Sequence, residues 1–146
     1  MSKPGRGESK LALECPPGSV YDEDTFGYLL EIERARAERS DHPVRLLFAT
    51  VEPVPGEPVP ISPSSATKLF AGLKQSLRET DVMGWYRQDR VAGAVLSARA
   101  GTPRPGVSDL VEQRVGERLR QRLPSRIARS LRVRVIQQGP RRFKKA

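Results

Sequence analysis

The sequence has few of the residues that enzymes and secreted proteins use most often for chemistry. Its 146 residues include one cysteine, one histidine and one tryptophan. The single cysteine, Cys15, excludes a disulfide within the chain and a cysteine-based metal site. The single histidine, His42, has no Cys, His or carboxylate cluster around it at metal-ligand spacing, so we expect a solvated loop residue there. The composition therefore predicts no metal, no cofactor and no catalytic triad.

Long hydrophobic runs are also missing. No segment approaches the roughly eighteen apolar residues of a membrane-spanning helix, and the start, MSKPGRGESK, has no apolar run behind its charges. We expect a soluble cytoplasmic protein without membrane insertion. The length suits one domain, since single cores commonly occupy about 100 to 150 residues. We assign residues 1–20 to a flexible N-terminal segment, 21–138 to the domain and 139–146 to a basic C-terminal tail.

The positive charge is concentrated in the last third of the chain. Residues 1–103 hold 13 basic and 14 acidic groups, a net charge of −1, whereas residues 104–146 hold 13 and 3, a net charge of +10. Such asymmetry favours an anionic partner. The alternative is an arginine-rich composition, with 20 Arg against 6 Lys, whose charges only solvate one face.

Hydrophobic spacing and capping residues predict three helices and four strands. One helix starts with Thr25 as its cap and ends near Ser40. A second has Ser62 as its cap and Pro63 at its first position. A third starts at Ser108 and is ended by Pro124. The predicted strands cover residues 44–52, 82–87, 90–98 and 130–138, and a tight turn at Gln88 and Asp89 joins the middle two.

The order of these elements predicts the fold class. From residue 44 onward they run strand, helix, strand, strand, helix, strand. With right-handed crossovers this order gives an α+β fold with a ferredoxin-like or split βαβ layout, in which two helices cover one face of a four-stranded antiparallel sheet. The helix from Thr25 is then an added lead-in.

One stretch, LRETDVMGWYRQDRV at residues 77–91, resembles the GGDEF domain of bacterial diguanylate cyclases, a palm-like fold. That family has an L-R-x-[ST]-D step, five further residues and then G-G-[DE]-E-F at a hairpin turn. The residues that match the step are Leu77, Arg78, Thr80 and Asp81. The signature position holds Arg87, Gln88, Asp89, Arg90 and Val91. Upstream, FGYLLEIERARAERSDHPVRLLFATVE is similar to the family's lead-in helix and first strand, so the resemblance is collinear over residues 21–136.

The resemblance implies a degenerate member without cyclase activity. The family joins two GTP molecules by two-metal phosphoryl transfer, with carboxylates on the first strand and on the hairpin. Thr50 stands at the first-strand metal position, and Glu52 matches a second, less stringent acidic site. At the hairpin Arg87 and Gln88 replace the glycines, Asp89 alone remains acidic, and Arg90 brings a positive charge that repels Mg²⁺. We therefore expect no enzyme activity and no metal at these positions.

Arg78 and Asp81 lie at the spacing of the family's inhibitory site for cyclic di-GMP. The resemblance implies that Arg78 bonds guanine and phosphate acceptors and that Asp81 accepts from a guanine edge. The protein would then be a non-catalytic signalling receptor in bacteria. The structural alternative is that Arg78 stabilises the end of a helix and that Asp81 accepts backbone hydrogen bonds at the start of a strand.

Two other functions stay open at this stage. A basic surface could bind nucleic acid or another acidic partner through its arginines, which are Arg114, Arg118, Arg122, Arg132 and Arg134. Residues 90–98 lack the aromatics of an RNA-binding sheet, so base recognition of that type is not expected. Trp85 and Tyr86 are adjacent on a strand, so one of them must face the core. The third possibility is a ligand-free adaptor for a protein partner or a homodimer.

Overall fold

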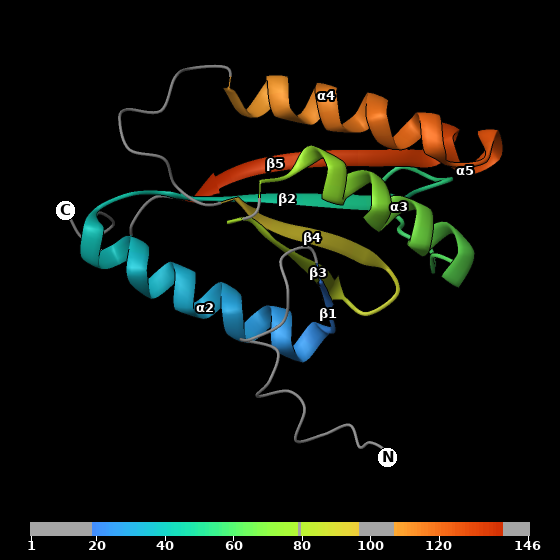
Figure 1. Cartoon of the computed structure of the whole chain (residues 1–146). Coiled ribbons are helices and arrows are strands. Elements are labelled where there is room, and N and C mark those ends of the chain that lie inside the picture. The colour runs from blue at the N-terminus through green and yellow to red at the C-terminus, as the bar shows by residue number, and fades with distance from the viewer. Residues whose placement is uncertain (1–18, 79, 97–106, 139–146) are drawn as a thin grey trace, which may run out of the picture.

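A five-stranded mixed sheet organises the chain in a computed structural model that describes residues 19–78, 80–96 and 107–138 (Figure 1). Cys15 and the basic tail lie outside these residues. The strands, in the sheet order β1-β3-β4-β2-β5, are β1 (Val20–Tyr21), β3 (Val82–Arg87), β4 (Val91–Leu96), β2 (Val44–Val51) and β5 (Leu131–Gln138). The helices are α2 (Glu23–Ser40), α3 (Pro63–Ser76), α4 (Val107–Arg122) and α5 (Ser125–Ser130).

The α+β class is confirmed, and the sheet differs from the prediction at one edge. The strands β3, β4, β2 and β5 are antiparallel neighbours. The sheet is nevertheless mixed and not wholly antiparallel, because the unpredicted β1 pairs in parallel with β3 through Val20 and Met83. Two residues give no periodicity from which a strand could be predicted. A second unpredicted element is the six-residue helix α5 between α4 and β5.

Two helices cover one face of the sheet, as predicted. The helices α3 and α4 lie over the same side of the sheet (Figure 1). The side chains of Leu69, Leu73 and Leu119 are fully buried in the core that these helices form with the strands. Leu47 and Ala49, two residues apart on β2, face this core because alternate residues of a strand point to the same side. Burying such leucines contributes about 1.5 to 3 kcal/mol each before the entropic cost of folding is counted.

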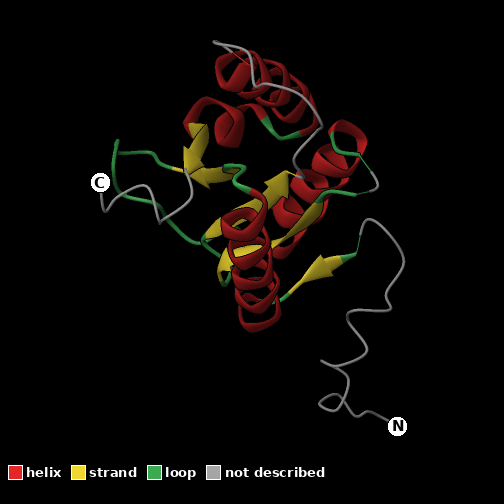
Figure 2. Ribbon diagram, turned by 90° about the vertical axis from the view of Figure 1, so that its left-hand side faces the viewer, coloured by secondary structure: helices red, strands yellow, loops and turns green. Residues whose placement is uncertain are grey.

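The helix α2 covers the opposite face. Phe26 and Leu30 of α2 pack against Leu46 of β2 and Val95 of β4 in a second, smaller core. The side view shows helices on both sides of the sheet (Figure 2). The lead-in helix is thus the second outer layer of the domain. Within the described part of the chain, every helix is too short or too polar to span a lipid bilayer.

Capping residues set where the helices begin. Ser62 caps α3 by accepting a hydrogen bond from the backbone N–H of Ser65, and Pro63 follows at the first helical position, as predicted. The prediction for α2 was wrong by one turn. Asp22 is its cap and accepts from the backbone N–H of Thr25 at 2.9 Å, so Thr25 lies inside the helix. Both residue types suit the cap position, and the sequence alone did not separate them.

Side chains of α4 cover the outer edge of β5. The backbone N–H of Val135 donates to Glu112 Oε2 at 2.8 Å, and Arg120 Nη2 donates to the carbonyl oxygen of Leu131 at 3.4 Å. Unpaired edge strands invite pairing with another chain. The helix α4 therefore occupies backbone groups that would otherwise extend the sheet.

Candidate functional site

The carboxyl end of β2 meets the β3–β4 turn and the start of β5 at one end of the sheet. Ala49 pairs with Ala92 of β4, and Val51 pairs with Leu131 of β5. Thr50 and Glu52 stand at this end. The topology therefore places Thr50 and Glu52 close to the turn at residues 88–90.

Glu52 is a buried carboxylate whose two oxygens are both engaged. Its side chain is 1% exposed. Oε2 accepts from Thr50 Oγ1 at 2.5 Å and from Arg134 Nη1 at 3.3 Å. Oε1 accepts from the backbone N–H of Gly56 at 3.0 Å and from Arg134 Nη2 at 3.4 Å. The carboxylate thus accepts four hydrogen bonds, two of which come from one guanidinium.

These donors lower the pKa of Glu52 to about 2. The largest cause is the Thr50 hydroxyl, and the Gly56 N–H and the Arg134 guanidinium act in the same direction, while burial opposes them. Glu52 is therefore ionised at neutral pH, with its charge satisfied inside the protein. Among the described residues, no three His, Cys, Asp or Glu side chains lie close enough together to hold a metal ion.

The β3–β4 turn is longer than predicted. It contains three residues, 88–90, and not the two-residue turn expected at Gln88 and Asp89. Arg90 N–H donates to the carbonyl oxygen of Arg87 at 3.0 Å, and Asp89 has a left-handed φ of 62°. A register shift between Trp85 and Arg87 accommodates the additional residue.

Two neighbouring segments hold this turn. The start of α2 exchanges two hydrogen bonds with it, from Gln88 N–H to Glu23 Oε1 at 2.7 Å and from Glu23 N–H to Gln88 Oε1 at 3.1 Å. The loop after β2 contributes a bond from Ile61 N–H to the carbonyl oxygen of Asp89 at 2.7 Å. The side chains at 87–90 are exposed, and Val91, the first residue of β4, is half-buried. The turn is thus fixed in place while its charged side chains stay at the surface.

Arg78 and Asp81 are brought together in the turn between α3 and β3. Asp81 Oδ2 accepts from the backbone N–H of Arg78 at 2.9 Å, and Asp81 Oδ1 lies 3.8 Å from Arg78 Nη2. The Asp81 N–H returns a bond to the Arg78 carbonyl at 3.0 Å. The side chain of Asp81 is 5% exposed and that of Arg78 is 40% exposed. The carboxylate therefore closes the turn, and Arg78 is the more exposed side chain of the pair.

The five arginines predicted as a polyanion site fall into two groups with different surroundings. Arg118 and Arg122 lie against α3, where Arg118 Nη1 donates to the backbone oxygen of Gln75 at 3.3 Å and Arg122 Nη2 donates to Gln75 Oε1. Arg114 is exposed on the same helix. Arg132 and Arg134 alternate with the buried Leu131 and Val135, so they project from the other face of β5.

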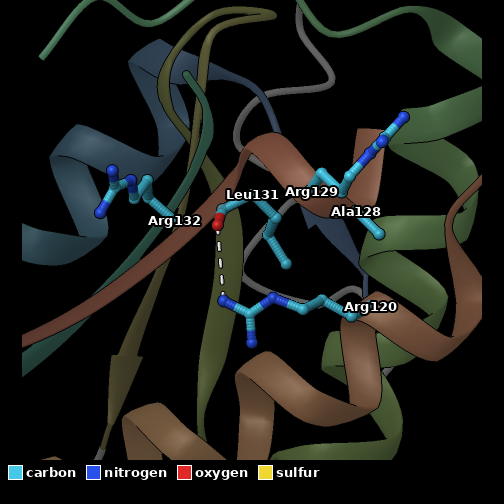
Figure 3. A pocket seen from close by; sticks show the side chains of 5 residues that line it. All are labelled: Arg120, Ala128, Arg129, Leu131 and Arg132. Carbon is cyan, nitrogen blue, oxygen red and sulfur yellow. Dashed lines mark hydrogen bonds between the residues drawn. The ribbon is translucent and has the colours of Figure 1, made fainter. Parts of the chain in front are cut away.

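An open hollow of about 350 Å³ lies beside the junction of α4, α5 and β5, and its lining residues are Arg120, Ala128, Arg129, Leu131 and Arg132. Figure 3 shows Arg120 reaching toward the Leu131 carbonyl, while Arg129 and Arg132 extend away on different sides. Arg129 was missed as a site residue because α5 was not predicted, and Arg120 was missed because it lies on α4 outside the four-residue spacing of Arg114, Arg118 and Arg122. The sequence signal that could have indicated α5 is Pro124 before SRIARS, since prolines are frequent at helix starts.

Trp85, Tyr86 and His42, the other residues considered in the sequence, take part in packing or in a turn. Trp85 is 7% exposed and packs edge-on against Phe70, with ring centroids 5.1 Å apart. Tyr86 faces the other side of the sheet and packs against Phe48 at 4.8 Å. His42 is half-buried in the turn after α2, where its backbone N–H donates to the carbonyl oxygen of Ala37 at 3.1 Å. Stacking of a base on Trp85 is therefore blocked by the core.

Comparison with known proteins adds no family to this description. No protein-family model matches the chain, and a search of curated proteins found no match. What the site can do is therefore inferred from its geometry: a buried carboxylate held by an arginine, a fixed turn with exposed charges, and arginines that project outward.

Proposed function

We propose that this chain is a non-catalytic regulatory module with a GGDEF-like domain, which acts by binding and not by chemistry. The observation that carries this proposal is the state of Glu52. Its carboxylate already accepts hydrogen bonds from the Thr50 hydroxyl, the Gly56 backbone N–H and the two terminal nitrogens of Arg134. Metal-assisted phosphoryl transfer needs carboxylate oxygens that are available to divalent ions.

The surrounding charges support the same proposal. Arg134 forms an ion pair with Glu52. The β3–β4 turn places Arg90 beside the loop after β2, where Arg90 Nη1 donates to the carbonyl oxygen of Pro58 at 3.4 Å. Arginine stays protonated at all physiological pH values, so these groups raise the free energy of a nearby Mg²⁺. A module without chemistry takes its role from what it binds.

Cyclic di-GMP is the small ligand that we propose for Arg78. The Arg78 side chain is 40% exposed, and its guanidinium has planar N–H donors that match guanine and phosphate acceptors. Asp81 orients this side chain and the turn that carries it. The direct contact would therefore come mainly from Arg78, with the aspartate as a positioning residue.

Two measurements test the proposal separately. Incubation with GTP and Mg²⁺ should yield no cyclic di-GMP by chromatography, and product formation would refute the non-catalytic assignment. Calorimetry with cyclic di-GMP should give a binding isotherm, which Arg78→Ala weakens about tenfold or more through loss of a charge-assisted contact. Arg36→Ala is the matched control, because Arg36 also pairs with a carboxylate three residues away, Glu33 at 3.2 Å. Absence of heat at high micromolar ligand would refute this ligand while leaving the non-catalytic assignment standing.

A further inference from the structure

The segment that contains α4, α5 and β5 carries a large uncompensated charge. Residues 107–138 hold eight arginines and three carboxylates, a net charge of +5, whereas residues 19–78 hold seven basic and nine acidic groups, a net charge of −2. Arg134 is neutralised by Glu52. The other seven, which we name the arginine surface, have no carboxylate at ion-pair distance in the described segments: Arg114, Arg118, Arg120, Arg122, Arg126, Arg129 and Arg132.

The hydrogen bonds that these arginines make leave their charge in place. Arg118 and Arg122 donate to Gln75, and Arg120 donates to a backbone carbonyl. These acceptors are neutral, and each guanidinium has five N–H groups, so donors remain for a ligand. The contacts also hold the side chains in position, which reduces the entropy lost on binding.

The spacing of the arginines suits an extended anion. Arg114, Arg118 and Arg122 are four residues apart on α4, which corresponds to steps of about 6 Å along the helix. At the end of α4 the hollow brings Arg120, Arg129 and Arg132 together, but Arg129 and Arg132 point to different sides (Figure 3). Guanidinium groups that diverge cannot enclose one small phosphate. They can contact successive charges of a polymer.

The composition of the surface distinguishes nucleic acid from a membrane or an acidic protein. Among large hydrophobic residues in the described segments, only Leu110 is strongly exposed on α4 or α5, whereas Val115 and Leu119 of α4 are buried. A membrane-surface helix needs an apolar face available to lipid, and protein interfaces need an apolar centre. Interfaces with nucleic acid are more polar and strongly positive, and arginine forks match phosphate oxygens.

We propose that the arginine surface binds the phosphodiester backbone of nucleic acid without reading its base sequence. Residues 107–138 contain no Phe, Trp or Tyr, so this surface has no ring on which a base could stack. Phosphate contacts fix affinity and register, while base contacts carry the sequence information. This proposal is independent of cyclic di-GMP and of the GGDEF-like assignment.

The test is fluorescence anisotropy of the full chain with a labelled duplex DNA of about 20 base pairs, titrated at salt concentrations from about 50 to 200 mM. The logarithm of affinity should fall with that of salt by about 0.9 for every phosphate engaged. The double variant Arg129→Gln/Arg132→Gln should reduce the magnitude of this slope by about 1.8. The ratio of the affinity at about 50 mM salt to that at about 200 mM salt should therefore be about tenfold smaller in the variant than in the wild type. Neither arginine makes a hydrogen bond or ion pair that the fold depends on within the described residues, so the variant should melt like the wild type.

The matched control removes the same charge elsewhere. Arg36→Gln/Arg39→Gln on the last turns of α2 should leave the salt slope unchanged. A second duplex of different sequence should bind within about twofold. The proposal is overturned by no binding at the lowest salt, by equal effects of both double variants, or by anionic vesicles binding where DNA does not. It is also overturned if deletion of residues 139–146 abolishes binding while Arg129→Gln/Arg132→Gln binds like the wild type, because the tail would then be the site.

Discussion

Arg134 of β5 holds Glu52, the residue after β2, through both of its terminal nitrogens, at 3.3 and 3.4 Å. The pair is asymmetric, since the Glu52 side chain is 1% exposed and the Arg134 side chain is 52% exposed. The carboxylate is thus buried and satisfied, while the arginine keeps part of its hydration. The pair joins the loop after β2 to the edge strand β5, and it occupies the place where the resemblance led us to look for metal ligands.

Glu52→Gln should lower the stability of the domain at neutral pH by about 1.5 to 3 kcal/mol, because hydrogen bonds to a charged group are lost or weakened. The pKa of Glu52 is lowered in the folded state from 4.5 to about 2. Ionisation of Glu52 therefore stabilises the fold fully above about pH 4.5, and this contribution is lost as the pH falls toward 2. Urea unfolding at several pH values, followed by Trp85 fluorescence, measures the difference.

The difference in stability between the wild type and Glu52→Gln should shrink steadily between pH 4.5 and pH 2. Glu31→Gln is the control, because the Glu31 side chain is 63% exposed in its pair with Arg34 and should show little change at any pH. A gap of constant size from neutral to acidic pH would contradict the assigned pKa.

Arg134 and Arg132 offer a matched pair for testing the ion pair itself. Both project from the same face of β5, but only Arg134 contacts Glu52. Arg134→Gln should destabilise the protein by about 1 to 3 kcal/mol, because the buried carboxylate loses a bidentate partner. Arg132→Gln should change stability by less than about 0.5 kcal/mol, as is usual at the surface. Equal midpoints of chemical denaturation for the two variants would show that the bidentate pair contributes nothing.

Gly84→Ala should disturb the edge formed by β1 and β3. A Cβ atom at residue 84 would lie 2.5 Å from the backbone oxygen of Tyr21, its partner in β1, and backbone cannot swing aside as a side chain can. We expect a cost of about 1 to 3 kcal/mol or release of β1. Gly27→Ala is the control, since a Cβ there meets nothing within 4 Å and alanine favours the helix. Thermal melts that rank the two variants the other way would argue against the β1–β3 pairing.

Much of the fold could be predicted because local and long-range signals agree. Ser62 and Pro63 mark a helix start, and Leu69 and Leu73 recur at helical spacing on the face that is buried. In β5 the buried Leu131 and Val135 alternate with exposed arginines, as expected for a strand with one wet face. The two-residue strand β1 and the six-residue helix α5 depend on tertiary packing and have no hydrophobic pattern from which they could be predicted.

The candidate site was harder to predict because side-chain partners depend on register. Positive charge alone grouped Arg134 with the helix arginines, whereas the pairing of β5 with β2 brings it to Glu52. Similarly, Arg118 was expected on this basic surface, but it contacts α3, where the backbone oxygen of Gln75 accepts its hydrogen bond. Charge patterns predict that a surface is basic, and only the packed arrangement decides which charges stay uncompensated.

The stabilities of an Asp81 variant and an Arg78 variant can distinguish a structural role of their turn from a ligand-binding role. Asp81→Ala removes the acceptor of the Arg78 backbone N–H and should cost about 1 to 2 kcal/mol, as loss of a side-chain cap does. Arg78→Ala leaves that backbone bond in place and should cost less than about 0.5 kcal/mol, because its ion pair is long and partly exposed. Denaturant titration without ligand separates these effects from binding. If Arg78→Ala were the more destabilising of the two, the arginine would be a structural residue, and any loss of cyclic di-GMP affinity in that variant would have to be attributed to the turn.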